Sequence, residues 1–163
     1  MLRPTPLRLS AAFLLILALT SATLAGGLSS PTTASPAIGP SSEWSPPTVI
    51  DPSRGDLGAV SCASANICVA VDGSGNVLMY SGGSWSSPES IDSVGISSVS
   101  CPTTSFCAAV DGNGDLLTYD GVSWSLPESL DGVELYSISC PTSGSCVAVD
   151  GGANALFYDN GVW

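Results

Sequence analysis

The 163-residue chain contains no histidine, three Lys and Arg side chains in total, and a formal charge of −11 at neutral pH. Such a chain repels phosphate backbones, which excludes nucleic-acid binding and disfavours anionic membranes. The three cations are all arginines, so the missing His and Lys also exclude Ser-His-Asp and Cys-His triads, HExxH zinc sites and Schiff-base chemistry.

Residues 1–25 have the order of a secretory signal peptide. Arg3 and Arg8 supply the positive charge, residues 11–19 form an apolar run, and small residues precede a predicted cleavage after Ala25. The apolar run is too short for a membrane-spanning helix, which needs roughly 20 residues. We therefore expect a secreted, extracellular protein.

Residues 26–43 are rich in Ser, Thr, Pro and Gly and have no periodic apolar face, so they are predicted to form a flexible or extended linker. The remaining residues, 44–163, are enough for one modest domain. Within that domain Arg54 is the only basic side chain.

The domain consists of tandem repeats. Trp44, Trp85, Trp124 and Trp163 lie 41, 39 and 39 residues apart, and cysteine, aspartate and tyrosine positions keep the 39-residue step. We expect three copies of the unit, at about 44–84, 85–123 and 124–163.

Short segments within each copy, such as 96–101 and 107–111, are rich in β-branched and small apolar residues and are separated by Gly, Pro, Asp and Ser. These are strand and hairpin signals, and nothing has helical spacing. Four short strands in about 39 residues match the size of one propeller blade. The predicted fold is all-β, with three four-stranded antiparallel blades forming an incomplete or self-assembling β-propeller.

The recurring patterns Val-Ser-Cys-Pro-Thr, Cys-Val-Ala-Val-Asp-Gly and Leu-x-Tyr-x-Gly-x-x-Trp resemble those of secreted bacterial β-propeller repeat proteins, the broad group of kelch, WD-repeat and tachylectin-like propellers. The resemblance covers residues 44–163. The kelch pattern has a double glycine before its tyrosine, whereas Gly82 and Gly83 follow Tyr80 here. The resemblance therefore implies the architecture and does not identify a subfamily.

Six cysteines at fixed spacing in an exported domain indicate a disulfide framework. The repeat favours pairing within each copy, across a five-residue connection between adjacent antiparallel strands. Metal binding is the competing interpretation, and it is disfavoured without histidine in an oxidising compartment. The expected pairs are Cys62–Cys68, Cys101–Cys107 and Cys140–Cys146.

Three Asp-Gly segments, 72–76, 111–115 and 150–154, resemble calcium loops because oxygen-bearing side chains alternate with glycine. The twelve-residue loop and its distal glutamate are absent, so hairpin turns are the favoured interpretation. No cofactor is expected. The weak calcium candidates are Asp72, Asp111, Asp115 and Asp150.

No catalytic motif is present, and we expect no enzyme activity. Glu89 and Glu128 would suit a paired-carboxylate glycosidase, but residues repeated between copies usually serve the fold. The Trp and Tyr positions are interpreted as core, with sugar stacking as the alternative. Residues that break the repeat are better binding candidates, because loops between repeats gather on one face of a propeller. They are Arg54, Asp56, Glu134 and Tyr136.

Closed propellers typically have 4–8 blades, so three copies leave three interpretations. The favoured one is a truncated piece of a longer propeller, and the others are assembly with further copies of the chain or an open arc. The expected function is an exported non-catalytic binding or scaffold module for an extracellular glycan or protein. The alternative is a truncated or degenerate fragment of a larger secreted propeller enzyme, such as a glycoside hydrolase.

Overall fold

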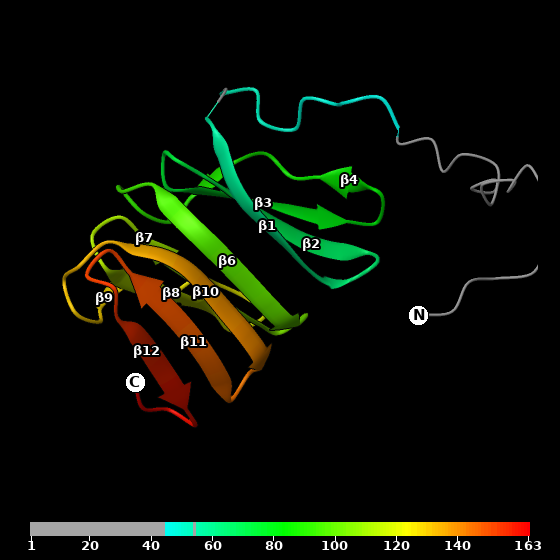
Figure 1. Cartoon of the computed structure of the whole chain (residues 1–163). Coiled ribbons are helices and arrows are strands. Elements are labelled where there is room, and N and C mark those ends of the chain that lie inside the picture. The colour runs from blue at the N-terminus through cyan, green and yellow to red at the C-terminus, as the bar shows by residue number, and fades with distance from the viewer. Residues whose placement is uncertain (1–44, 54) are drawn as a thin grey trace, which may run out of the picture. The chain divides into compact units, whose positions relative to one another are not determined.

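The computed structural model describes residues 45–53 and 55–163. The predicted signal peptide and linker, Trp44 and the candidate ligand residue Arg54 lie outside the described residues. All regular elements in the described part are β-strands, joined by turns and short loops (Figure 1). Within it, no helix is long and apolar enough to span a membrane.

The first sheet is an antiparallel meander with two short strands on its outer edge. Its inner strand β1 pairs with β2, β2 pairs with β3, and both short strands pair with β3. The strands are β1 (Leu57–Ser64), β2 (Ile67–Asp72), β3 (Asn76–Ser81), β4 (Ser84–Trp85) and β5 (Glu89–Ser90).

The second and third sheets repeat this meander. The second contains β6 (Ile96–Thr103), β7 (Phe106–Asp111), β8 (Asp115–Tyr119) and β9 (Glu128–Ser129). The third contains β10 (Leu135–Thr142), β11 (Ser145–Asp150) and β12 (Ala155–Asp159). The prediction of an all-β fold with antiparallel sheets is confirmed, although the strand numbers are five, four and three instead of four in each sheet.

The sheets are offset from the predicted repeat ranges. Trp85, which was expected to begin the second copy, pairs with Tyr80 in the first sheet, and their ring centroids lie 5.4 Å apart. Trp124 forms the equivalent bridge to Tyr119 in the second sheet. Because the ring packs on the tyrosine of the preceding strand, each of these tryptophans closes a sheet instead of opening the next one.

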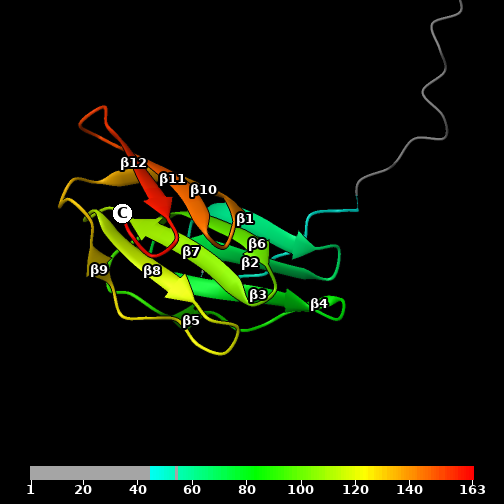
Figure 2. The same cartoon turned by 90° about the horizontal axis from the view of Figure 1, so that it is seen from below.

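The three sheets pack face to face, with the inner strands β1, β6 and β10 side by side (Figures 1 and 2). Valines on the first sheet and Ile96, Val99 and Leu117 on the second form one buried cluster. Ala108, Val110 and Leu116 pack with the third sheet in another. The core therefore consists of two layers, one between each pair of neighbouring sheets.

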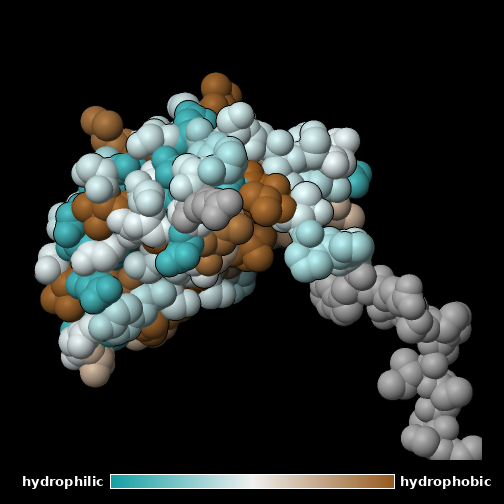
Figure 3. All heavy atoms as spheres, turned by 90° about the horizontal axis from the view of Figure 1, so that it is seen from above, coloured by the Kyte–Doolittle hydropathy of each residue, from teal (hydrophilic) through white to brown (hydrophobic). Residues whose placement is uncertain are grey.

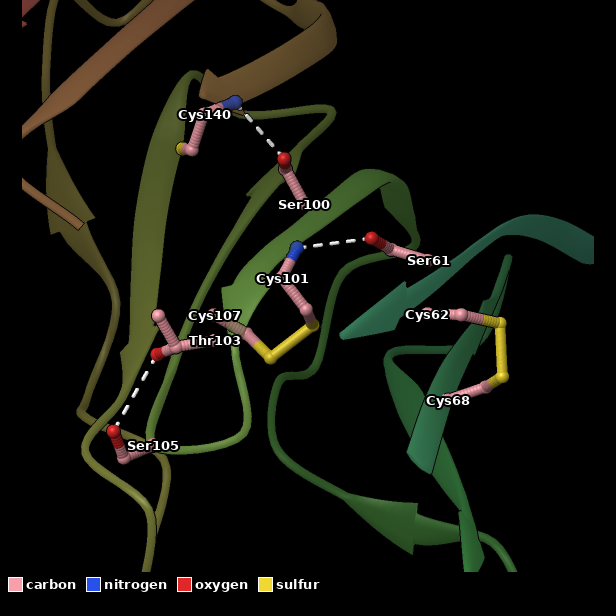
Figure 4. Close-up of a disulfide and its surroundings, with 9 residues drawn as sticks. All are labelled: Ser61, Cys62, Cys68, Ser100, Cys101, Thr103, Ser105, Cys107 and Cys140. Carbon is pink, nitrogen blue, oxygen red and sulfur yellow. Dashed lines mark hydrogen bonds between the residues drawn. A yellow bond between two sulfur atoms is a disulfide. The ribbon is translucent and has the colours of Figure 1, made fainter. Parts of the chain in front are cut away.

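Polar contacts also join the inner strands. The Ser61 hydroxyl accepts a hydrogen bond from the Cys101 backbone N–H at 2.9 Å, and the Ser100 hydroxyl accepts one from the Cys140 N–H at the same distance (Figure 4). The inner strands therefore keep the same register from one sheet to the next.

Candidate functional site

One edge of the domain is built from two kinds of loop, which we call the loop edge. It contains the turns 72–76, 111–115 and 150–154 and the segments 51–56, 92–95 and 131–134 that lead into the inner strands. Backbone hydrogen bonds join each turn to the segment beside it. The Gly73 N–H donates to the Asp56 carbonyl at 2.9 Å, and the Gly151 N–H donates to the Glu134 carbonyl at 2.9 Å.

Buried aspartates anchor the first and third turns. Asp72 Oδ1 accepts the backbone N–H groups of Ser74 and Asn76 at 2.9 and 2.8 Å, and its Oδ2 accepts the Asn76 side-chain amide at 2.8 Å. Asp150 is bonded in the same way, and the Asn154 side-chain amide is the main cause of its lowered pKa. These oxygens stabilise turns, as the favoured interpretation of the sequence expected.

The second turn lacks one of these bonds. Asp111 Oδ1 accepts the N–H groups of Asn113 and Asp115 at 3.0 and 2.7 Å, but Oδ2 is buried without a partner. Burial raises the pKa of the Asp111 carboxyl, and the neighbouring Asp92 carboxyl and the charge of Asp115 raise it further.

Asp92 was missed by the sequence interpretation, although a signal was present. Asp51, Asp92 and Asp131 each follow an Ile or Leu at the repeat step. Asp51 is 4 % exposed and accepts the Ser53 and Gly55 N–H groups at 2.8 Å. The Ser53 hydroxyl is the main cause of its lowered pKa.

Asp56 and Glu134 lie in the loop edge and Tyr136 lies beside it in β10, but the structure does not bring all three together. The exposed Glu134 and Tyr136 lie beside the third turn, where the Tyr136 hydroxyl would be 3.0 Å from a Cβ atom placed on Gly151. Asp56 is also exposed but lies beside the first turn, on the other side of the second sheet.

The loop edge is strongly acidic. In the described residues it carries nine carboxylates, whereas the opposite edge carries Asp120 and Asp159. In that part of the chain no group of three or more His, Cys, Asp or Glu side chains is arranged to hold a metal ion. The carboxylates of the loop edge are Asp51, Asp56, Asp72, Asp92, Asp111, Asp115, Asp131, Glu134 and Asp150.

Two hollows lie away from these candidates. One of about 420 Å³ lies between the outer parts of the second and third sheets, with Glu128 and Trp163 in its lining. The other, of about 300 Å³, lies on the outer face of the first sheet and is lined by Ile50, Leu57, Gly58, Ala59, Val60, Ala70 and Trp85. The second hollow is mostly apolar, so its chemistry differs from that of the loop edge.

The three predicted disulfides are present, each joining two neighbouring strands of one hairpin. Figure 4 shows Cys62–Cys68 and Cys101–Cys107. Cys101 and Cys107 are buried between the first and second sheets, whereas Cys68 is half-buried and Cys62 is exposed. Three disulfides fit an extracellular location.

Neither a family model nor a curated protein sequence matches the chain. The solved structure of YCF48 bound to D1 peptide, a β-propeller, is similar with a TM-score of 0.61 and 18 % sequence identity. The match covers 70 % of this chain and 40 % of that one, so the chain spans less than half the length of this neighbour. The likeness shows that the fold is β-propeller-like.

Proposed function

We propose that the chain is an exported, non-catalytic binding module that presents its acidic loop edge to a basic segment of an extracellular protein. The observation that carries this proposal is the gathering of nine carboxylates on one edge, four of them buried, against two on the opposite edge. A surface with one sign of charge attracts and orients a partner of the opposite sign. The similar structure of YCF48 bound to D1 peptide supports a role in binding peptides.

The contact residues that we propose are Glu134 and Tyr136. Tyr136 is 56 % exposed and lies two residues from a solvent-exposed carboxylate. An aromatic face beside a carboxylate suits a lysine or arginine side chain, because the ring contacts the stem while the carboxylate pairs with the charge. Asp56 extends the acidic surface on the far side of the second sheet.

Carbohydrate binding is the second candidate, and the exposed ring of Tyr136 is the observation that favours it. The tryptophans favour it less, because Trp85 and Trp124 pack against tyrosines at 5.4 and 5.5 Å between ring centroids. An origin in a glycoside hydrolase has little support, since Glu89 and Glu128 lie on short outer strands of two different sheets.

The test is a binding measurement on the secreted protein by biolayer interferometry. An Arg- and Lys-rich peptide should bind and should lose affinity as salt rises, whereas the same peptide with glutamine at every basic position should not bind. Glu134→Gln and Tyr136→Ala should each weaken binding about fivefold or more, and Asp159→Asn on the opposite edge should leave it unchanged.

Equal binding of the basic and neutral peptides would contradict the proposal. A glycan array on the same protein separates the second candidate. Glycan binding that is lost in Tyr136→Ala and does not change with salt concentration would favour carbohydrate binding over the binding of basic peptides.

A further inference from the structure

The outer face of the first sheet exposes apolar side chains whose equivalents are buried in the other sheets. Leu57 and Val60 are 48 % and 62 % exposed. The residues 39 positions later, Ile96 and Val99, are 2 % and 6 % exposed because the first sheet covers them. In Figure 3, seen from the side of residues 45–53 and the start of β1, hydrophobic residues gather in a patch near the middle of the face.

The outer face of the third sheet also exposes apolar side chains, and here the equivalents in the first and second sheets are buried. Val71 and Val110 are both 0 % exposed, because each packs against the next sheet along the chain. Their equivalent, Val149, is 41 % exposed. Met79 of the first sheet packs against the first core cluster, and its equivalent in the third sheet, Phe157, is 67 % exposed.

The hollow on the first sheet corresponds to a site that is already filled elsewhere in the chain. Its lining residues Leu57, Val60 and Ala70 have as equivalents Ile96, Val99 and Ala109, which belong to the cluster covered by the first sheet. The hollow is therefore the apolar surface that one sheet offers to the sheet before it. Nothing in the described residues covers it.

The polar contacts between sheets repeat in the same way. The Ser98 and Ser100 hydroxyls accept the N–H groups of Ile138 and Cys140 at 3.2 and 2.9 Å. Their equivalents on the third sheet are Ser137 and Ser139, and both are exposed. The equivalents of the two donors are the N–H groups of Val60 and Cys62, on the exposed face of the first sheet.

We propose that the third sheet of one copy docks on the first sheet of a second copy, and that two copies close into a ring of six sheets. Phe157 of one copy fills the hollow lined by Leu57 and Val60 of the other, and Ser137 and Ser139 accept the N–H groups of residues 60 and 62. Each interface repeats the contact already made twice within the chain. Six sheets lie within the usual range of 4–8 for closed propellers, and a head-to-tail contact that closes gives a ring.

A second copy is the occupant that these observations select, because one chain carries both halves of the interface at positions fixed by its own repeat. The apolar residues, the hollow and the hydroxyl acceptors all match under the same 39-residue step. The interface uses none of the nine carboxylates of the loop edge, although Tyr136 borders it next to Ser137, so this assembly goes beyond the proposed binding function.

The experiment measures the mass of the secreted protein by light scattering and its dissociation by sedimentation. The wild type should have the mass of two copies. Val60→Lys and Phe157→Asp should each weaken association about thirtyfold or more, because each places a charge in an apolar contact. Both positions are exposed within one copy, so folding should survive, which circular dichroism would verify.

Mixing the two variants separates a head-to-tail contact from a symmetric one. In the mixture one interface is wild-type on both sides, and the other carries both substitutions, so that the introduced lysine faces the introduced aspartate. The two-copy mass should therefore return. Val122→Asp is the matched control, because Val122 is 87 % exposed on a loop outside both faces.

Three results would overturn the proposal. They are a monomeric wild type at tens of micromolar, a dimer that both single variants leave intact, and a failure of the mixture to associate. Assemblies larger than two copies would be a fourth contrary result, because the ring would not have closed at six sheets.

Discussion

Replacing Asp115 with asparagine should stabilise the protein. In the first and third turns an asparagine side chain donates to Oδ2 of the anchoring aspartate, at 2.8 Å in the first and 2.7 Å in the third. In the second turn Asp115 occupies that position, and Oδ2 of Asp111 is buried without a partner. Asp115→Asn supplies the missing donor and removes a negative charge that raises the pKa of Asp111.

The size of the effect follows from the hydrogen bond gained. A hydrogen bond to a charged group contributes about 1.5–3 kcal/mol, and Asp115 is half-buried, so we expect a gain of about 1–2 kcal/mol at pH 7. For a domain of this size the gain corresponds to a rise of about 5 °C in Tm. Calorimetry and urea denaturation followed by tryptophan fluorescence would measure it.

The gain should depend on pH. Because the pKa of Asp111 in the folded state lies above its ordinary value of 3.8, its stabilising contribution is complete below that value and is lost as pH rises through the folded pKa. The advantage of Asp115→Asn should therefore be small near pH 3.5 and should grow toward pH 7. The reverse change in the first turn, Asn76→Asp, should lower the free energy of unfolding at pH 7 by a similar amount.

A neutral or destabilising Asp115→Asn at pH 7 would refute the reasoning, provided that Asn76→Asp is destabilising. A gain of equal size at pH 3.5 and pH 7 would show that the Asp111 charge is not involved.

The remaining predictions concern two glycines, one disulfide bond and the Asp-Gly turns. Gly75 and Gly83 have positive φ angles of 82° and 93°, so replacing either with alanine should lower the free energy of unfolding by about 1 kcal/mol. Gly75→Ala should lower it further, because its Cβ would lie 2.7 Å from the Val94 carbonyl. Urea denaturation would measure both losses. Equal losses would show that this contact relaxes. Replacing both Cys101 and Cys107 with alanine should lower the free energy of unfolding by about 2.4 kcal/mol, because the short loop is no longer closed in the unfolded chain. Lost packing should lower it further, so a total loss below about 1 kcal/mol would contradict this account. Millimolar calcium should leave Tm unchanged, and a rise of several degrees would support the calcium interpretation of the Asp-Gly turns.

The period of the repeat was predictable, but its phase was not. A pattern that recurs every 39 residues looks the same wherever the unit is cut, so the sequence alone could not show whether Trp85 opens or closes a sheet. That depends on which strand it pairs with, and it pairs backward with Tyr80. The disulfides were predictable because each pair is close in sequence and the spacing never varies.

The candidate site was predictable only in part. Of the residues that break the repeat, Asp56 and Glu134 lie in the loop edge and Tyr136 lies beside it in β10, but their binding role stays a prediction. They could not show that a whole sheet separates Asp56 from the other two. The influence of Asp92 on the pKa of Asp111 was also hidden, because it depends on how a connecting segment approaches the turn of the next sheet.

The disulfides bear on how the chain folds and oxidises. Each bond closes within a single hairpin, between cysteines six positions apart, and none ties one sheet to another. Short loops close with less entropy loss than long ones, so a cysteine meets its correct partner before any wrong one arrives. Oxidation can therefore proceed hairpin by hairpin as the chain folds. A duplicated repeat would carry both cysteines of its own disulfide, so adding a repeat would leave no cysteine without its partner.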